Sequence, residues 1–375
     1  MSGRDVALLW HGRRANAWVP DQLTERNLSL TETTVRSTEQ AAAAVRRGSD
    51  GLPARWEPLA RLLLRAEGVA SSFIEGLRAP LADVAAAELD PTVGGTAAWV
   101  AANLAAVTAS MGEAHDGPLT VDSLHRWHRT LMAGSSHLPR HLVGAFRDAQ
   151  GWIGGTSPLD AVLVPPPPEY IEGLIGDLIV FVNRDDIDAV TQAAVAHAQF
   201  EVVHPYGDGN GRVGRVLIGW VLARRLSLVS PPPVSVRIAA DRGGYLAGLT
   251  QFRLGNLDAW VSWFAKVARE AGDATVNLVH AIAELEVRWA QRLTDVRVDA
   301  AARRMVSVLS EHPVINAATA ATALGVSERA CRSAMETLAK HGIVQPFQGA
   351  GGGAGRPHNW WVAGELVDLV TAWSR

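Results

Sequence analysis

The sequence is short of cysteine and of long apolar runs, and both absences exclude whole classes of protein. Its single cysteine, Cys331, rules out an intrachain disulfide framework and a cysteine-rich zinc site, and fits a reducing compartment. The N-terminus has only a short apolar run before charged residues return, too short for a secretory signal. The run LIVFV near residue 180 is far too short to span a bilayer. We therefore expect a soluble cytoplasmic protein that does not enter a membrane.

The chain also carries little net charge. Its formal charge of −3 argues against a general polyanion binder, so any role in nucleic-acid binding has to be local. With 375 residues, 48% of them hydrophobic, the chain is folded and too long for one ordinary core. Two or three domains are expected.

Helical periodicity dominates, and the expected fold class is an all-α core with a small β-hairpin. Residues 1–50 are predicted to form an irregular arm followed by an alanine-rich helix. The next helix, 55–76, ends at Gly76 and has inward positions at Leu59, Leu62, Leu63, Ala66, Ala70 and Phe73. Further helices are expected over 96–111, 121–134, 171–182, 187–203, 212–225 and 244–270. The last of these has inward positions at Leu246, Leu249, Trp260, Trp263 and Phe264. Glycines and four consecutive prolines make 144–170 a loop or small hairpin.

The C-terminal part has a different pattern. A long helix over 274–310 leads into a helix-turn-helix, in which Gly325 marks the turn and Ser327 caps the second helix. A glycine-rich tip, GAGGGAG, then lies between QPF and NWWV, as in the hairpin wing of a winged helix. Residues 300–375 are therefore predicted to form a winged helix-turn-helix domain.

Residues 204–215, HPYGDGNGRVGR, combine three glycines with reactive side chains directly before a predicted helix. His204 is expected at the end of the preceding helix, because proline disfavours a helical conformation in the residue before it. The glycines let backbone N–H groups turn toward one point at the positive end of the next helix. Such a site binds anions, and phosphate is the usual occupant.

The side chains supply the other parts of a phosphate site. Arg212 and Arg215 are three residues apart on one helix face, within reach of phosphate oxygens. Asp208 offers a hard oxygen ligand for Mg²⁺, and Asn210 can hydrogen-bond a phosphate oxygen. His204 can act as a general base near pH 7.

Simpler interpretations explain only part of this segment. Glycine with Asp and Asn is most often a plain turn. A calcium loop is excluded because Arg212 stands where that loop needs an oxygen ligand. A Walker motif is excluded because no Lys-Ser/Thr follows the glycines. The combination within twelve residues favours phosphate chemistry.

The segment closely resembles the signature of the Fic (filamentation induced by cAMP) family, HxFx(D/E)GNGRxxR, with Tyr206 in place of the phenylalanine. The resemblance extends to AHAQFEVVHPY, to FRDAQGWIGG and VPPPP upstream, and to WVP near residue 18, and so covers most of the chain. Family members are typically adenylyltransferases that move AMP from ATP to a hydroxyl side chain (Ser, Thr or Tyr) of a target protein. The resemblance implies a Fic-type helical core, ATP as substrate and Mg²⁺ as cofactor.

Residue by residue, the resemblance implies that His204 deprotonates the target hydroxyl, Asp208 holds Mg²⁺ and Arg215 holds the γ-phosphate. The implied anion hole consists of Gly209, Asn210, Gly211 and Arg212. The hydroxyl would attack the α-phosphate in line, and pyrophosphate would leave. The ring of Tyr206 can still anchor the loop, provided that its hydroxyl finds a partner.

The segment SSFIEG, residues 71–76, is similar to the (S/T)xxxE(G/N) inhibitory motif of N-terminally autoinhibited Fic proteins. Its motif residues are Ser71 and Glu75, and the resemblance implies that Glu75 pairs with Arg215 and blocks the γ-phosphate. The plain alternative is a solvated glutamate on a helix. However, an acid at a helix C-terminus opposes the helix dipole, so a nearby cation would account for it.

Two further regions acquire roles from the resemblance. The interval 144–168 resembles the flap that holds a target segment by strand-like pairing, although it could be an ordinary surface hairpin. Its expected edge consists of Asp160, Ala161, Val162, Leu163 and Val164. Tyr245 and Leu246 lie where family members place residues near the adenine.

The helix-turn-helix keeps a second class of function open. Its second helix offers Arg329, Arg332 and Lys340 to DNA, but Glu328 and Glu336 offset them. Protein contacts or dimerisation are therefore at least as well supported as DNA binding. The alternatives to AMP transfer are a DNA-binding transcriptional regulator with a nucleotide-sensing core, and a Fic enzyme that removes AMP or acts as a kinase.

Four regions are expected in all. These are an N-terminal arm and inhibitory-helix region, 1–95, a catalytic core, 96–272, a linker helix, 273–299, and the winged helix-turn-helix domain, 300–375. Similar proteins imply a homodimer, and the sequence does not identify the target protein.

Overall fold

A computed structural model describes residues 3–24, 26, 28–52, 57–90, 92–348 and 360–374. The elements of the first half are β1 (Gly3–Trp10), β2 (Arg13–Pro20), α1 (Glu32–Asp50), α2 (Glu57–Ile74), α3 (Leu81–Leu89), α4 (Gly95–Asp116), α5 (Val121–Met132), the 3₁₀ turn η1 (Arg140–Leu142) and α6 (Pro168–Val182). Those of the second half are α7 (Ala189–Val203), α8 (Asn210–Leu226), α9 (Val234–Ala240), α10 (Arg242–Arg253), α11 (Leu257–Arg292), α12 (Ala301–Glu311), β3 (Val314–Asn316), α13 (Ala317–Leu324), α14 (Glu328–Lys340), β4 (Gln345–Phe347), β5 (Trp360–Val362) and α15 (Gly364–Trp373). The prediction of a mostly helical fold is confirmed.

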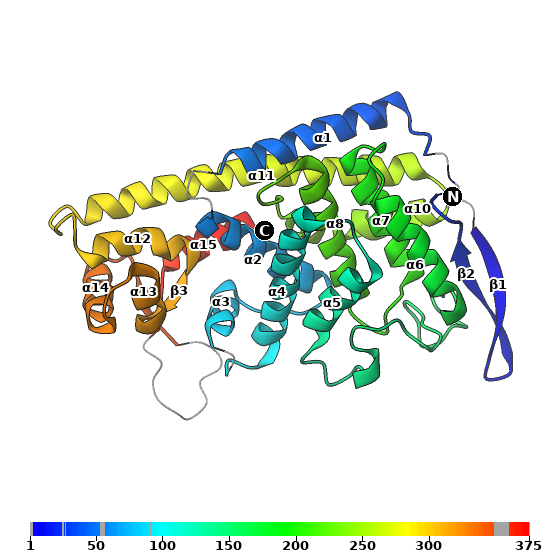
Figure 1. The fold of residues 1–375 in the computed structure, drawn as a ribbon, viewed down its shortest axis with the longest axis horizontal. Coiled ribbons are helices and arrows are strands. Elements are labelled where there is room, and N and C mark those ends of the chain that lie inside the picture. The colour runs from blue at the N-terminus through cyan, green and yellow to red at the C-terminus, as the bar shows by residue number, and fades with distance from the viewer. Residues whose placement is uncertain are drawn as a thin grey trace.

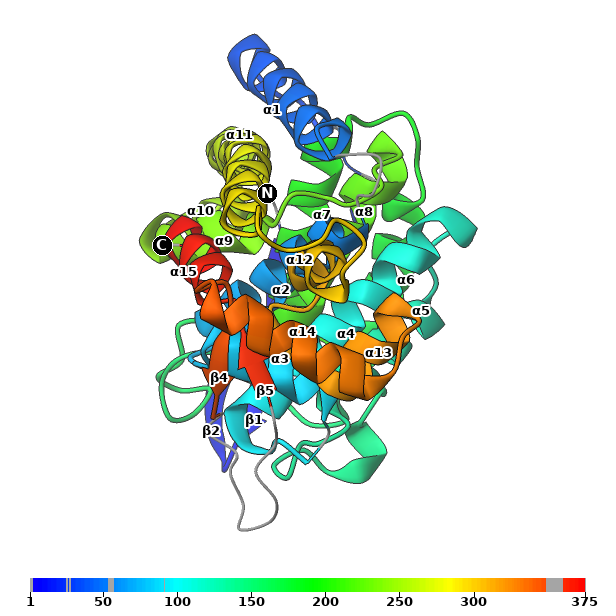
Figure 2. The ribbon, with the colours of Figure 1, turned by 90° about the vertical axis from the view of Figure 1, so that its left-hand side faces the viewer.

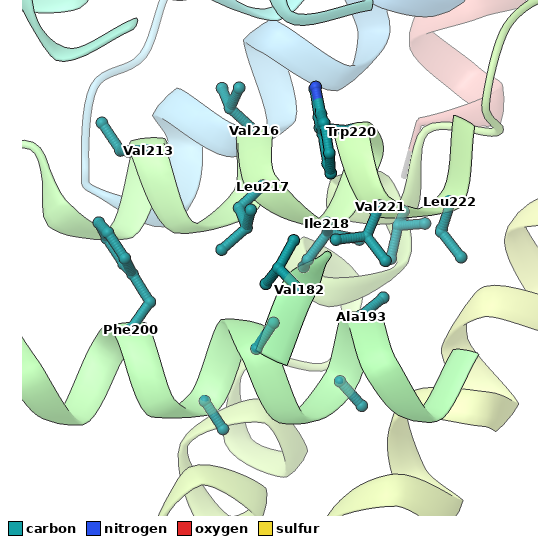
Figure 3. Packing of buried hydrophobic residues seen from close by; sticks show 14 of the residues in the cluster. Val182, Ala193, Phe200, Val213, Val216, Leu217, Ile218, Trp220, Val221 and Leu222 are labelled. Carbon is teal, nitrogen blue, oxygen red and sulfur yellow. The ribbon is translucent and has the colours of Figure 1, made fainter. Parts of the chain in front are cut away.

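Helices α7 and α8 form the centre of the molecule. Nearly every residue of α7 is buried, as is typical of a helix that is apolar on all sides. Phe200 of α7 lies opposite Val213 of α8, and Ala193 of α7 lies opposite Val221 of α8 (Figure 3). The loop between these two helices is therefore anchored at both ends in a rigid core.

The first twenty residues do not form the predicted irregular arm. Strands β1 and β2 pair antiparallel from Gly3↔Pro20 to Trp10↔Arg13. His11 and Gly12 both have positive φ, 47° and 78°, which suits the two-residue turn of a hairpin. The hairpin and the C-terminal elements lie at opposite ends of the molecule (Figure 1).

Two helix predictions over the C-terminal half are wrong in their boundaries. The segment 244–270 is interrupted between α10 and α11 at Gly255, whose φ is +95°. Leu246 was expected to face inward but is 60% exposed, whereas Trp260 and Phe264 are buried. The helix expected over 274–310 is likewise divided between α11 and α12. The side chain of Arg303 donates to the carbonyls of Leu293 and Val296, and so compensates for the interrupted helix hydrogen bonds.

The C-terminal elements group at one end of α11 (Figures 1 and 2). Gly325, at φ +65°, ends α13, and the Ser327 side chain caps α14 as predicted. Strands β3, β5 and β4 form a three-stranded antiparallel sheet in that order. The expected wing tip, GAGGGAG, lies outside the described residues, and the winged-helix assignment stays a prediction. None of the described helices combines the length and apolar character needed to cross a membrane.

Helices α1 and α11 run side by side along one face of the molecule (Figure 1). Their close approach requires glycine, because a Cβ at Gly272 of α11 would lie 2.4 Å from the carbonyl oxygen of Ala44 of α1. At the other end of the pair, the Asp258 carboxylate accepts hydrogen bonds from Thr31 and Thr34.

Replacing Gly272 by alanine should therefore push α1 away from α11. We expect Gly272→Ala to lower the free energy of unfolding by about 1–3 kcal/mol in urea denaturation. Gly112→Ala in α4 is the matched control, because the described atoms leave open space around its added Cβ. The control should be neutral or stabilise by up to about 1 kcal/mol. Equal stability of the two variants would contradict the close-packing argument.

Candidate active site

The loop between α7 and α8 turns through two left-handed residues. His204 (φ +50°) ends α7 and donates its backbone N–H to Phe200 at 2.9 Å. Gly209 (φ +79°) then caps α8, which begins at Asn210. The first backbone N–H groups of α8 have no acceptor in their own helix and face the loop, as an anion site requires.

Tyr206 anchors this loop in the core. Its ring is buried and stacks on His128 with centroids 3.9 Å apart, and its hydroxyl lies 3.1 Å from His125 Nδ1. The substitution of tyrosine for phenylalanine thus has the hydroxyl partner that it requires. Asn210 accepts the Tyr206 N–H and donates to the Tyr206 carbonyl, both at 2.8 Å. In the structure the Asn210 amide therefore closes the loop, and its place in the anion hole stays a prediction.

His128 of α5 also supports the loop, and sequence reasoning missed it. Its Nδ1 accepts the N–H of Gly144, so its Nε2 carries the proton and donates to the Asp208 carbonyl at 3.0 Å. Burial lowers the pKa of His128 to about 4, so the ring is neutral at pH 7. In the sequence it was one polar residue within an amphipathic helix, and no pattern linked it to a loop eighty residues away.

Arg212 and Arg215 place two buried guanidinium groups beside the start of α8. Nη2 of Arg212 lies 3.6 Å from Met132 Sδ and 3.7 Å from Asp208 Oδ1. Nε of Arg212 and Nη1 of Arg215 are buried without a hydrogen-bond partner among the described residues. Because unpaired buried donors of a cation are costly, this arrangement suits an anionic ligand with several oxygens.

The end of α2 supplies acceptors to Arg215. Ser71 accepts Nε–H at its Oγ and Nη2–H at its carbonyl, both at 2.9 Å. Glu75 Oε1 accepts from Nη2 at 2.8 Å. Burial alone would raise the pKa of Glu75, but Arg215 and the neighbouring Arg212 and His204 hold it below its ordinary value. The structure thus brings together the residues of the SSFIEG segment and the second arginine of the signature.

His204 is arranged as a neutral base. Its Nδ1 lies 3.3 Å from the Glu201 carbonyl and so carries the proton, which leaves Nε2 as the acceptor. Burial, aided by nearby Arg147, lowers the pKa of His204 to about 4. Arg147 also donates to the His204 carbonyl at 2.9 Å and ties the flap region to the loop.

Asp208 provides the exposed oxygens of the site. Half of its side chain is exposed, and Oδ1 accepts the Gly209 N–H at 2.6 Å. Within the described part of the chain, no group of three or more His, Cys, Asp or Glu side chains is placed to hold a metal ion. A single carboxylate still fits Mg²⁺, which is commonly bound by one or two carboxylates together with substrate phosphates and water.

The interval 144–168 contains no described strand, only an isolated bridge between Ile153 and Leu163. The Asp160 carboxylate holds the turn, accepting from Thr156 and Ser157, and these bonds lower its pKa to about 2. Val164 is buried, and its carbonyl accepts from Trp18 of β2 at 2.8 Å. Of the five expected edge residues, all except Val164 are at least partly exposed.

The expected adenine contacts lie on α10. Tyr245 is buried, and its hydroxyl lies 2.9 Å from His197 Nε2. Leu246 points away from the core. Tyr245 therefore packs in the core against α7, and its position gives no direct evidence for an adenine contact.

Glu201 of α7 is a second carboxyl group close to Arg215, and the sequence gave no signal for it. Its Oε1 is buried without a hydrogen-bond partner in the described structure, and would lie 2.8 Å from a Cβ at Gly214. Burial, together with the charge of Glu75, outweighs Arg215 and raises the pKa of Glu201 to about 8.

With this geometry in view, the chain can be compared with known proteins. Residues 118–222 match the model of the Fic/DOC family. The chain contains a Fic/DOC domain. Protein adenylyltransferase fic-1 of Caenorhabditis elegans is 28% identical over 159 residues, 42% of this chain and 28% of that protein. A probable protein adenylyltransferase of Aquifex aeolicus is 44% identical over 59 residues, 16% of this chain and 18% of that protein. The matched segments thus span about a third or less of these relatives.

Solved structures agree on the fold. A Fic family protein from Desulfovibrio desulfuricans superimposes with a TM-score of 0.54 at 19% identity, over 89% of this chain and 97% of that chain. Residues 134–508 of C. elegans Fic-1 give a TM-score of 0.53 at 19% identity, over 66% and 74% of the two chains. The segment that matches the Fic/DOC model, residues 118–222, includes the 204–215 loop.

The raised pKa of Glu201 predicts a specific pH dependence of stability. A carboxyl group whose pKa is higher in the folded than in the unfolded protein stabilises the folded state fully at pH values below its unfolded pKa. For Glu201 this stabilisation is lost as the pH rises toward its folded pKa of about 8. Between pH 6 and pH 8, the free energy of unfolding measured by urea denaturation should fall by about 2–3 kcal/mol more for wild type than for Glu201→Gln. Glu365→Gln, whose carboxyl has a lowered pKa, should leave this slope unchanged. If the free energies of unfolding of wild type and Glu201→Gln change in parallel with pH, the raised pKa of Glu201 is refuted.

Proposed function

We propose that this protein is an adenylyltransferase that moves AMP from ATP to a serine, threonine or tyrosine hydroxyl of a target protein or of itself, and that Glu75 holds it in an inhibited state. The observation that carries the proposal is the position of Arg215. Its buried guanidinium lies next to the start of α8, where a terminal phosphate would need it, and donates a hydrogen bond to the Glu75 carboxylate. The adenylyltransferase names of the relatives support the same activity.

In this proposal each group acts on a defined atom. The N–H groups at the start of α8, with Arg212 and Arg215, bind the phosphate oxygens and orient the α-phosphorus. Nε2 of His204 accepts the proton of the target hydroxyl as its oxygen bonds to the α-phosphorus. The bond from the α-phosphorus to the bridging oxygen breaks, and pyrophosphate leaves. Asp208 would hold Mg²⁺, which when bound neutralises phosphate charge.

Inhibition follows from competition for Arg215. The Glu75 carboxylate occupies the side of the guanidinium that a γ-phosphate would use, and two negative groups at one place repel. The triphosphate would then bind without correct alignment of its α-phosphorus. Ser71 strengthens the block because it accepts two further Arg215 hydrogen bonds.

The regulatory alternative receives less support from the geometry. On α14, Arg332 is paired with Glu328 at 2.7 Å, which reduces the basic surface offered to DNA. DNA binding, a homodimer, a cytoplasmic location and the four proposed regions stay predictions.

Labelling with ATP marked at the α-phosphate tests this function. In the presence of Mg²⁺ we expect weak labelling of wild type, strong labelling of Glu75→Gly, and none of Glu75→Gly/His204→Ala, because the first change frees Arg215 and the second removes the base. ATP labelled at the γ-phosphate should transfer nothing, which separates AMP transfer from kinase activity.

Binding measurements make the labelling result interpretable. Glu75→Gly/His204→Ala should still bind ATP in calorimetry, because His204 is not part of the phosphate clamp. A Glu75→Gly protein that binds Mg²⁺ and ATP but transfers no label would contradict the proposed activity and favour a nucleotide-sensing role.

A further inference from the structure

Helix α2 packs on two different parts of the molecule. Its buried apolar side chains Leu64 and Ile74 belong to the central cluster formed around α7 and α8. The buried apolar side chains on the other side of α2 belong to a second cluster, which α2 shares with α12–α15 and the second half of α11. These side chains are Leu59, Leu62, Leu63, Ala66 and Ala70. More of the buried apolar surface of α2 therefore faces the C-terminal elements than faces the catalytic centre.

A buried charge strengthens the C-terminal attachment. The side chain of Arg65 in α2 is only 3% exposed and pairs with Glu88 of α3. Its Nη1 donates to the carbonyl of Glu311, the last residue of α12. Arg61, one turn earlier, pairs with the Glu311 carboxylate at 3.1 Å. Because a buried guanidinium needs its partners, Arg65 fixes α2 to the end of α12.

A second connection runs through α9. Glu67 of α2 accepts hydrogen bonds from the backbone and hydroxyl of Ser235. Two residues later, Arg237 donates to the carbonyl of Trp373 in α15 at 2.7 Å. The C-terminal elements thus contact α2 directly through α12 and indirectly through α9.

The middle of α2 lies against α4. A Cβ at Gly68 would lie 3.3 Å from Leu104 Cα, and Asn103 donates to the Gly68 carbonyl and to Ser72 Oγ. Gly68 therefore lies between the C-terminal attachment at Arg65 and the Arg215 contacts of Ser71 and Glu75. Ten residues separate Arg65 from Glu75, about 15 Å along a helix.

We propose that the C-terminal unit, residues 301–348 and 360–374, is the regulatory element of the active site: it holds α2 in the position from which Ser71 and Glu75 reach Arg215. This inference rests on the proposed function, since it names what controls that function. Because α2 is one unbroken helix, a shift of α12 moves the N-terminal half of α2 and, about the α4 contact, withdraws its other end from Arg215. A partner that displaces the C-terminal unit would thereby activate the enzyme.

Arg65→Met tests the proposal in the full-length chain, because it removes the charge and keeps the apolar stem. In an otherwise wild-type background, α-phosphate labelling should rise about five-fold or more, as expected for an ordinary coupling between two sites. In the Glu75→Gly background the same change should add nothing, because the contact it releases is already absent. Hydrogen exchange of residues 68–74 should become faster in Arg65→Met.

Arg126→Met is the control, since the side-chain hydrogen bonds of Arg126 go to Glu113 of α4 and Ser123 of α5. It should leave labelling and exchange unchanged. If Arg65→Met does not fold, Arg61→Ala takes its place, because that side chain is 58% exposed.

A rise of equal size in both backgrounds, or a folded variant with unchanged labelling and exchange, would overturn the proposal. If Glu75→Gly itself transfers no label, the proposed function fails, and the exchange of residues 68–74 alone decides the coupling.

Discussion

The site depends on one buried positive charge. The side chain of Arg215 is 1% exposed in the middle of the fold, where an unpaired guanidinium would strongly destabilise the protein. An anion therefore has to lie beside it in every state of the molecule. In the present state that anion is the Glu75 carboxylate, and a nucleotide phosphate is the other group of the same charge that the neighbouring helix terminus would accept. In the proposed function the two compete, because the protein provides one place for both.

The surrounding helices make this place rigid before any ligand arrives. The loop is fixed at its two ends by α7 and α8, and from the side by Tyr206 and His128. Asn210 closes it internally, so the N–H groups at the start of α8 keep their direction without a bound phosphate. Groups held in this way need no reorganisation during a reaction, which is the usual source of electrostatic catalysis.

The sequence predicted the parts of the site that lie close together in the chain. His204, Asp208, Arg212 and Arg215 fall within twelve residues, so spacing and residue type were sufficient. The supports were missed because they come from far away: His128 reaches a loop eighty residues later, and Arg65 reaches Glu311. The hairpin at residues 3–20 was missed because its turn, His11-Gly12, is unusual. The break after α11 was missed because helical periodicity continues across it, and Arg303 compensates for the interruption only in three dimensions.

The hydrogen bonds of Arg215 indicate why the proposed inhibition would need support from outside the site. Ser71 and Glu75 together accept from Nε and Nη2, whereas Nη1 stays buried without a partner in the described structure. A phosphate group, with more acceptor oxygens than one carboxylate, could also pair Nη1, and charge-assisted bonds of this kind are the strong ones. At the guanidinium itself, α2 is therefore the weaker partner. Its place beside Arg215 would have to be maintained by contacts elsewhere along the helix. Those made with the C-terminal unit include the hydrogen bond from Arg65 to the Glu311 carbonyl and the packing of the apolar side chains around Arg65.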